Sequence, residues 1–164
     1  MDEIQTAKAI RTSIKQGDTN KFTALITSNM ALLEKMTPFG TWLHVAASFG
    51  RKEIVRELLD LGVDVNRRGG VFDGGAINEA AADGHLEIVK YLFEFGAELD
   101  VSLPTRNPLF GAIQGGHIEI VRFLVERGIS TKIKYSGESM KDMDALAFAL
   151  ERGQSEIAAF LASR

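Results

Sequence analysis

The sequence contains no cysteine, which excludes disulfide bonds, thiolate metal ligands and a cysteine nucleophile. Proline is scarce, with 3 in 164 residues, and no stretch approaches the run of about 18 apolar residues that a membrane-spanning helix needs. The first ten residues include Asp2, Glu3 and Lys8 and lack the apolar core of a secretion signal. We therefore expect a cytoplasmic protein that does not contact a membrane.

A large excess of one charge is also missing. The chain has 19 basic and 22 acidic residues, which gives a formal net charge of -3. That charge is too small to imply a general affinity for nucleic acid or anionic lipid. With 45% hydrophobic and 25% charged residues, the composition is that of a folded domain with a continuous core.

The chain does contain one short sequence motif, which occurs in four similar copies. The copies read Glu53-Ile54-Val55, Glu87-Ile88-Val89, Glu119-Ile120-Val121 and Glu156-Ile157-Ala158. Each copy begins three residues after a glycine, and these glycines (Gly50, Gly84, Gly116 and Gly153) are 34, 32 and 37 residues apart. A period of about 33 residues indicates one helical unit stacked repeatedly.

Each unit has the residues of two antiparallel helices. The pairs Ala46-Ala47 and Ala80-Ala81 lie on a short first helix, where small side chains let the next unit approach closely. The residues Ile54-Val55 and Leu58-Leu59 form the apolar stripe of a second helix.

The ends of these helices are also marked in the sequence. Thr41, Asn107 and Asp144 precede a first helix and are predicted N-caps, with Pro108 in the first turn. The glycines at 62, 96 and 128 fall where a helix C-terminus takes a left-handed residue.

Together these motifs resemble the ankyrin repeat. The unit 41–66 carries the first-helix phrase Thr-Trp-Leu-His, then Ala-Ala, Glu-Ile-Val, paired leucines and the ending Gly-Val-Asp-Val-Asn. The next two units carry Gly84-His85 and Gly116-His117. The resemblance implies an all-α fold, an ankyrin-repeat solenoid of about five helix-loop-helix units with degenerate capping units at both ends. The expected divisions are an N-terminal cap unit (1–36), unit 1 (37–70), unit 2 (71–103), unit 3 (104–135) and a C-terminal cap unit (136–164).

No catalytic or metal site is predicted. His44, His85 and His117 each occupy a position that the resemblance explains as framework, and no cysteine joins them. No serine lies in a strand-turn-helix elbow, and no Lys-Ser/Thr follows the pairs Gly69-Gly70 and Gly74-Gly75. We expect no cofactor, no metal and no enzymatic activity.

Residues that the repeat does not require are candidates for binding a protein partner. Trp42 stands where the family usually has proline, and Phe49 lies at a position that the family varies for recognition. The stretch 130–143 is too long for the usual connection between units. The predicted partner-binding residues are Trp42, Phe49, Arg67, Arg68, Phe72, Asp83, Arg106, Tyr135 and Arg152.

Other interpretations of these residues stay open at this point. Trp42 can instead cover the apolar linker 30–39, and Phe49 can pack within the molecule. The two arginines at 67 and 68 can be solvated charges at a hairpin tip. The stretch 130–143 can be a disordered insertion.

The function implied by the resemblance is binding of another protein by a chain that is monomeric when free. A small, free-standing ankyrin protein with this degenerate C-terminal unit is similar to the ankyrin-type immunity proteins encoded beside bacterial toxins, which bind a toxin and block it. The alternatives are a cellular scaffold or adaptor and a secreted effector module, since all three use the same kind of surface.

Overall fold

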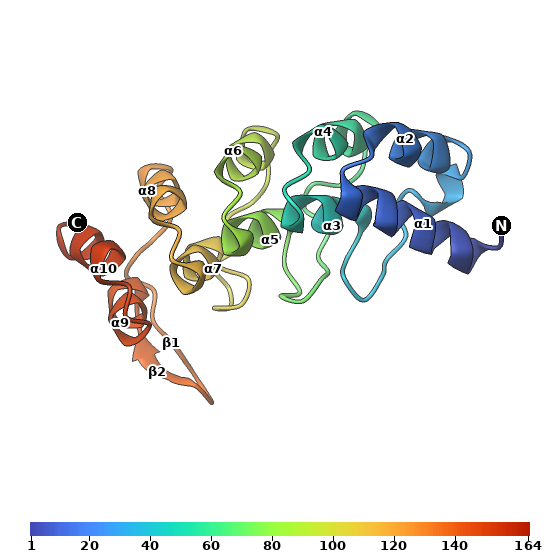
Figure 1. Ribbon diagram of the computed structural model, residues 1–164. Helices are drawn as coiled ribbons and strands as arrows, with labels where there is room; N and C mark the ends of the chain where they lie inside the picture. Colours follow the sequence, from blue (N-terminus) through green and yellow to red (C-terminus); the bar gives the residue numbers. More distant parts are fainter.

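The computed structural model describes residues 1–164 and contains ten α-helices arranged as two rows (Figure 1). The inner row comprises α1 (Glu3–Gln16), α3 (Trp42–Ser48), α5 (Ala76–Asp83), α7 (Pro108–Gly115) and α9 (Ala145–Glu151). The outer row comprises α2 (Thr19–Thr27), α4 (Lys52–Asp60), α6 (Leu86–Glu94), α8 (Ile118–Glu126) and α10 (Ser155–Ala162). A short 3-10 turn, η1 (Met30–Leu32), follows α2. The prediction of an all-α solenoid of five helix-loop-helix units is confirmed.

Three of the inner helices, α3, α7 and α9, begin at the predicted caps. The side chain of Asn107 accepts a hydrogen bond from the Leu109 N–H at 2.9 Å, and that of Asp144 accepts one from the Ala147 N–H at 2.9 Å. Thr41 forms a capping box with His44. Each cap satisfies N–H groups that the first turn of a helix leaves without a partner.

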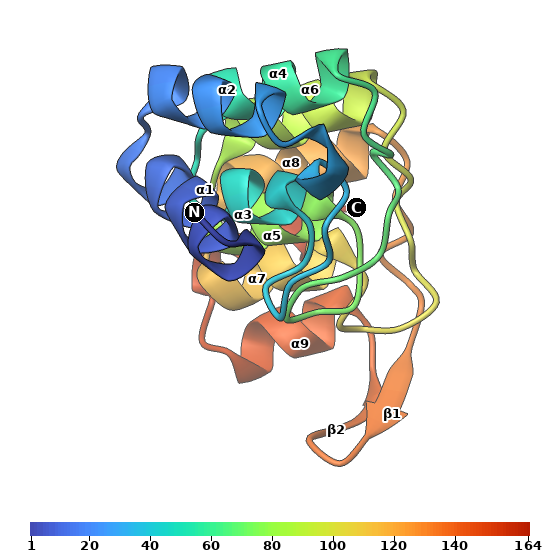
Figure 2. The same cartoon turned by 90° about the vertical axis from the view of Figure 1, so that its right-hand side faces the viewer.

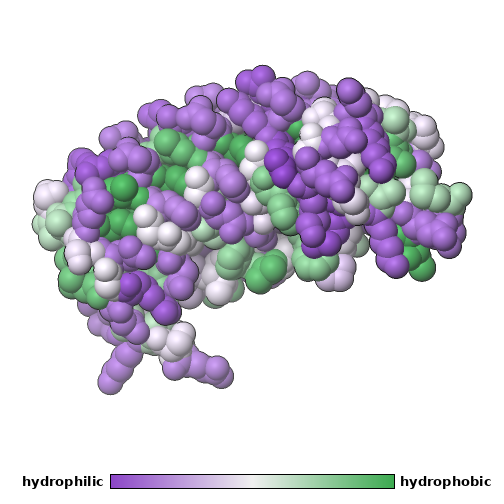
Figure 3. All heavy atoms as spheres, in the orientation of Figure 1, coloured by the Kyte–Doolittle hydropathy of each residue, from purple (hydrophilic) through white to green (hydrophobic).

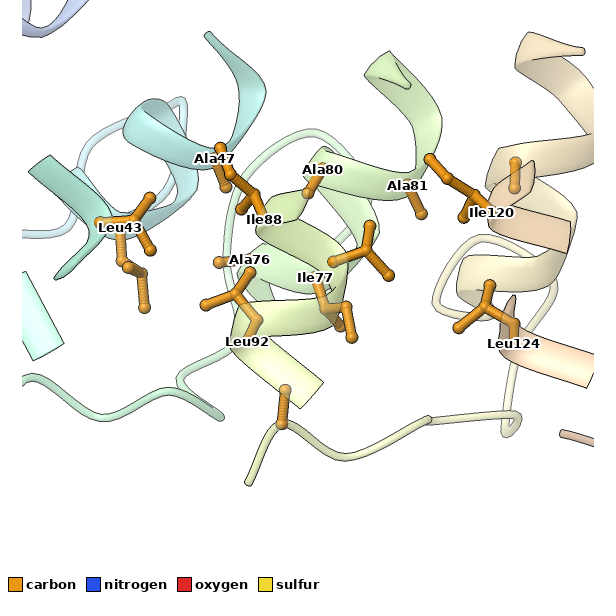
Figure 4. Close-up of a cluster of buried hydrophobic side chains, with 14 of the residues drawn as sticks. Leu43, Ala47, Ala76, Ile77, Ala80, Ala81, Ile88, Leu92, Ile120 and Leu124 are labelled. Carbon is orange, nitrogen blue, oxygen red and sulfur yellow. The ribbon is translucent and has the colours of Figure 1, made fainter. Parts of the chain in front are cut away.

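The core lies between the two rows and runs the length of the stack. Figure 4 shows Ala47, Ala80 and Ala81 of inner helices beside Ile88 and Leu92 of α6, with Ile120 and Leu124 of α8 in the next layer. All are buried. Small residues on the inner helices allow neighbouring units to approach, and the larger aliphatic side chains of the outer helices fill the space between the rows.

Neighbouring units are joined by a contact that recurs at the residue after three of the inter-helix glycines, Gly50, Gly84 and Gly116. His85 Nε2 donates to the Ser48 carbonyl at 2.8 Å, and His117 Nε2 donates to the Ala82 carbonyl at 2.9 Å. Arg51 donates in the same way to carbonyls at the end of α1, including that of Ile14 at 3.1 Å. These bonds satisfy carbonyls at the C-terminal ends of inner helices and fix each unit on the one before it.

The linker between α2 and α3 packs on Trp42. The indole N–H of Trp42 donates to the Leu32 carbonyl in η1 at 2.8 Å, and the side chain is only 1% exposed. The tryptophan therefore closes the core between the first two units.

The stretch 130–143 is not a plain loop and not disordered, because it folds into the antiparallel strands β1 (Tyr135–Gly137) and β2 (Met140–Met143). Tyr135 pairs with Met143, and Gly137 pairs with Met140. The hairpin projects beyond the helices next to α9, as Figures 1 and 2 show. It is the one feature of the architecture that the helical repeat did not predict.

Candidate functional site: a groove on the inner-helix face

The inner helices and the connections that precede them form a face whose residues vary from unit to unit. The fourth residue after each N-cap shows this variation: it is Val45 in α3, Glu79 in α5, Gly111 in α7 and Phe148 in α9. The same backbone position therefore presents four different chemistries. Two hollows lie on this face.

The larger hollow, called the C-terminal groove below, has a volume of about 340 Å³. It lies over α5, α7 and α9 and is walled by the connection before α7 and by the β1–β2 hairpin. Its lining residues are Phe72, Asn78, Ala82, Pro104, Thr105, Asn107, Phe110, Gly111, Gln114, Ser136, Gly137, Ser139, Met140, Phe148 and Arg152.

The floor of the C-terminal groove is aromatic and rigid. The rings of Phe110 and Phe148 stack with centroids 4.9 Å apart, and Tyr135 meets Phe110 edge-on at 5.0 Å. All three side chains are less than 10% exposed. Gly111 and Ala82 leave the space above this floor open, because neither has a side chain long enough to fill it.

The hairpin wall is fastened by a buried polar network. The Tyr135 hydroxyl donates to the Val101 carbonyl at 2.7 Å and accepts from Asn107 Nδ2 at 3.1 Å. Burial raises the pKa of this hydroxyl above its ordinary value, so it stays protonated and able to donate. The base of the hairpin is thus held against the cap of α7.

Tyr135, a predicted partner-binding residue, has its ring turned inward. The ring is 8% exposed and packs on Phe110, so Tyr135 supports the groove from behind.

Phe72 and Arg152 are the two predicted residues that the fold brings into the C-terminal groove. Arg152 caps the end of α9, and its guanidinium lies 5.0 Å from the centroid of the Phe148 ring. It takes part in none of the ion pairs of the molecule. Arg106 lies beside the groove, where it pairs with the Asp73 carboxylate at 2.6 Å and accordingly stabilises the connection between units.

The smaller hollow, called the N-terminal hollow below, has a volume of about 130 Å³ and lies over α3. Its lining residues are Arg11, Phe39, Val45, Ser48, Phe49, Val71 and Glu79. Phe49 is 36% exposed, and Lys15 Nζ lies 5.6 Å from the centre of its ring. This aromatic therefore remains accessible, as predicted, while also contacting the first unit.

Two charged groups on either side of α3 line the N-terminal hollow without forming an ion pair. The guanidinium of Arg11 lies over the ring of Phe39 at 4.0 Å, and its buried Nε has no hydrogen-bond partner. Glu79 is 6% exposed, and burial, reinforced by the charge of Asp83, raises its pKa to about 7. A hydrogen bond from the Val71 backbone opposes this rise.

Trp42 is the clearest correction among the predicted site residues. With 1% of its surface exposed and its N–H bonded to Leu32, it cannot enter a partner pocket from this fold. The alternative, that it covers the apolar linker, is confirmed. A large apolar side chain next to an apolar segment gains more by packing against that segment than by facing water.

Arg67, Arg68 and Asp83 are exposed but are not among the residues that line the C-terminal groove. Arg67 lies 4.0 Å from Glu34, and Arg68 lies 3.4 Å from Asp100, with both arginine side chains more than half exposed. Asp83 accepts a hydrogen bond from the Ser48 hydroxyl at 2.6 Å. The fold therefore does not gather the nine predicted residues into one surface.

The histidines act as framework. His44 accepts at Nδ1 from the Thr41 N–H at 3.2 Å and donates from Nε2 to the Gly74 carbonyl at 2.9 Å. One neutral tautomer satisfies both bonds, and burial lowers the pKa of the ring. No three His, Asp or Glu side chains lie close enough together to hold a metal ion. None of the helices has the length and apolar character needed to cross a bilayer.

Sequence reasoning missed the residues that shape the two hollows, above all Arg11, Glu79, Gly111 and Met140. Glu79 and Gly111 could have been identified from the sequence, because each lies four residues after an N-cap. A charge or a glycine at this position interrupts an inner helix that is otherwise mostly apolar. No feature of the sequence predicts that Met140 lines the groove, because its position depends on how the hairpin folds.

Comparison with known proteins agrees with this architecture. The family model for ankyrin repeats, which spans three copies, matches residues 43–135 and 77–164. The chain is 28% identical over 97 residues to human ankyrin repeat and SOCS box protein 11, and 27% identical over 99 residues to the mouse protein of that name. These matches cover 59% and 60% of this chain but only 29% and 30% of the relatives, so the chain spans less than a third of their length. The chain belongs to the ankyrin repeat family, whose repeats are protein–protein interaction modules.

Proposed function

We propose that this chain is a non-catalytic, stoichiometric binder of another protein and that the C-terminal groove is the centre of the contact. The observation that carries the proposal is an open apolar groove whose one lining charge, Arg152, lies over the Phe148 ring and forms no ion pair within the molecule. Apolar cores bordered by polar rims, with arginine and aromatic residues at the centre, are typical of protein interfaces.

Catalysis is not part of the proposal. The polar side chains of the groove are amides and hydroxyls, and no titratable base lies among the residues that line it. Serine, threonine and amide groups without a base are weak nucleophiles. Recognition is what this set of residues can do.

Figure 3 shows one side of the molecule coloured by hydropathy. Hydrophilic residues dominate the face shown, and the hairpin projects from it with a hydrophilic tip. The apolar part of the C-terminal groove lies at the base of the hairpin, where Met140 is among the lining residues. A partner held here contacts the hairpin and the inner helices together.

The test begins with capture of the partner from the source cell and its identification by mass spectrometry. Calorimetry with the purified partner is expected to give a one-to-one complex that Gly111→Leu weakens at least tenfold, because the new side chain occupies the groove. A complex that forms equally well with the filled groove would contradict the proposal. Light scattering of the free protein tests whether it is monomeric, as we propose.

The narrower role we propose for this binding is inhibition of a toxin by a cytoplasmic immunity protein. The motivating feature is the C-terminal unit, which departs from the repeat and carries the hairpin that walls the groove. Co-expression with the captured partner is the decisive assay. Loss of the partner's toxicity supports the role, and a partner without toxicity rules it out.

A scaffold or adaptor role is the second candidate, and the likeness to ankyrin repeat and SOCS box protein 11 favours it. A scaffold leaves the partner active and holds a second protein at the same time. An assay of the partner's activity in the complex separates the two roles. A secreted effector role is the third alternative, and detection of the protein outside its source cell would support it.

A further inference from the structure

The chemistry of the C-terminal groove specifies more than a protein partner in general. Its floor comes from Phe110 and Phe148, and further apolar surface comes from Phe72 and Met140. A volume of about 340 Å³ is at the lower end of the range for ligand pockets, which suits one large side chain and its backbone. An aliphatic or aromatic side chain gains the most free energy from such a site, because it transfers apolar surface from water onto an apolar floor.

The lining of the groove carries a positive charge and no negative charge. Arg152 is the only charged residue among the 15 that line it. Its guanidinium lies over the Phe148 ring and forms no ion pair, so its donors are free to bind an acceptor above the floor. A carboxylate is the group that matches an arginine fork best, and pairing near an apolar wall strengthens the attraction.

The remaining lining residues match a peptide backbone. Gln114, Thr105 and Ser136 line the groove from α7, from the connection before it and from β1, and the Ser136 hydroxyl, which accepts from the Asp142 N–H at 2.9 Å, keeps its proton to donate. Such groups can both donate to carbonyls and accept from N–H groups. Because these residues come from three separate segments around the groove, an occupant that runs along it meets polar groups on both sides.

We propose that the C-terminal groove binds an extended segment of the partner in which a large apolar side chain lies within one or two residues of an Asp or Glu. The apolar side chain lies on the Phe110–Phe148 floor, and the carboxylate pairs with Arg152. This inference rests on the proposed function and adds the chemistry of the segment that is recognised. A basic segment is disfavoured, because it would bring a second cation against Arg152 without any carboxylate in the lining.

The test uses random linear peptides displayed on phage and selected on the immobilised full chain. The selected sequences are expected to share a large apolar residue next to, or one residue removed from, an acidic residue. Synthetic peptides of these sequences are then measured by fluorescence polarisation against three variants and the wild-type chain.

Each variant must distinguish loss of binding from loss of folding. Arg152→Glu reverses the charge and is expected to weaken binding by more than tenfold. Its control is Arg127→Glu, because Arg127 also caps a helix and also lies over a phenylalanine, at 4.8 Å from Phe123, but on the outer row. The control is expected to bind like the wild type.

The third variant, Gly111→Leu, fills the groove without straining the backbone. A Cβ at this position would lie 3.5 Å from the Ala82 Cβ, an ordinary contact, and leucine favours a helix more than glycine does. Melting curves of all variants verify that they are folded. The expected result is loss of peptide binding with retained melting temperature.

The outcomes separate the inference from the proposed function. Peptides without an acidic residue, or peptides blocked by Gly111→Leu but indifferent to Arg152→Glu, would overturn the acidic-segment inference and leave the groove as the binding site. Selected peptides indifferent to both variants would overturn the groove itself. Binding of a small aromatic carboxylate as tightly as the best peptide would overturn the peptide as the occupant.

Discussion

The two hollows on the inner-helix face are built on the same backbone and have opposite character. The N-terminal hollow is flanked by Arg11 and Glu79, charges of the chain itself, and has a volume of about 130 Å³. The C-terminal groove has a volume of about 340 Å³, an aromatic floor and one lining charge. One contribution to the difference is the variable position of the repeat, which is Glu79 in α5 and Gly111 in α7, and another is the β1–β2 hairpin that walls the C-terminal groove.

In this fold, different residues provide stability and recognition. Contacts such as those of His85 and His117 recur in every central unit and hold the stack together. Residues at the variable position take no part in these contacts, so they can change without loss of the framework. The N-terminal hollow contains a buried carboxyl group, Glu79, whose raised pKa links stability to pH, whereas the C-terminal groove offers accessible apolar surface. Substitutions in the framework should therefore change stability, and substitutions in the C-terminal groove should change binding.

Removal of residues 144–164 tests whether the last unit supports both the groove and the stack. The truncation removes Phe148 and Arg152 and takes away the ring that stacks on the buried Phe110 of α7. We expect a partly unfolded or aggregating protein, because an end unit shields a one-dimensional core. Circular dichroism and size-exclusion chromatography measure this. A monomer with unchanged melting would show that α9 and α10 are dispensable.

Trp42→Ala tests whether Trp42 stabilises the fold and takes no part in binding. The substitution removes a fully buried side chain and leaves the Leu32 carbonyl without its donor. We expect the free energy of unfolding to fall by about 3–5 kcal/mol, measured by urea denaturation. Peptide affinity at the C-terminal groove should persist at temperatures where the variant is folded. Loss of affinity in a fully folded variant would show that the two halves are coupled.

Glu79→Gln tests the cost of the buried carboxyl group. Burial and the charge of Asp83 raise its folded-state pKa from 4.5 to about 7, so the folded protein binds this proton more tightly than the unfolded chain. The stability linked to the proton is complete below pH 4.5 and is lost as the pH rises through 7.

Between pH 5 and pH 8 the wild type should therefore lose stability relative to Glu79→Gln, by up to about 3 kcal/mol. Denaturant titrations of both proteins across this range measure the difference. Asp83→Asn is the matched control and should reduce the loss only in part, because burial is the larger cause. Parallel pH profiles of wild type and Glu79→Gln would contradict the assignment.

His85→Ala and His117→Ala should have the smallest effect. Each removes one hydrogen bond to the preceding unit, at 2.8 Å and 2.9 Å, so each should lower stability by about 1 kcal/mol. Neither should alter peptide affinity at the C-terminal groove, since neither residue lines it. Thermal melting and fluorescence polarisation check both statements. A change in affinity without a change in melting temperature would place the histidines in the site.

The framework could be predicted from the sequence because it repeats. Residue types that recur at fixed spacing, such as the glycine and histidine at 84–85 and 116–117, have one structural explanation that fits every copy. The caps at Asn107 and Asp144 were predictable for the same reason.

The site was less predictable because it depends on residues that do not repeat. The sequence identifies Trp42 as an unusual aromatic but does not tell which side of its helix the linker 30–39 will cover. Tyr135 was assigned to a loop, and only the folded hairpin turns its ring inward onto Phe110. Phe72 and Arg152 were found because both lie where the repeat varies and faces outward.

The central claim is that a partner binds in the C-terminal groove and leaves the outer row free. Hydrogen–deuterium exchange of the free protein and of its complex with the captured partner tests it most directly. The account predicts slower exchange in the complex for residues 104–114 and 135–140, with the outer helices α6 and α8 unchanged. Protection confined to the outer helices, or to the arginines at 67 and 68 and their neighbours, would contradict it.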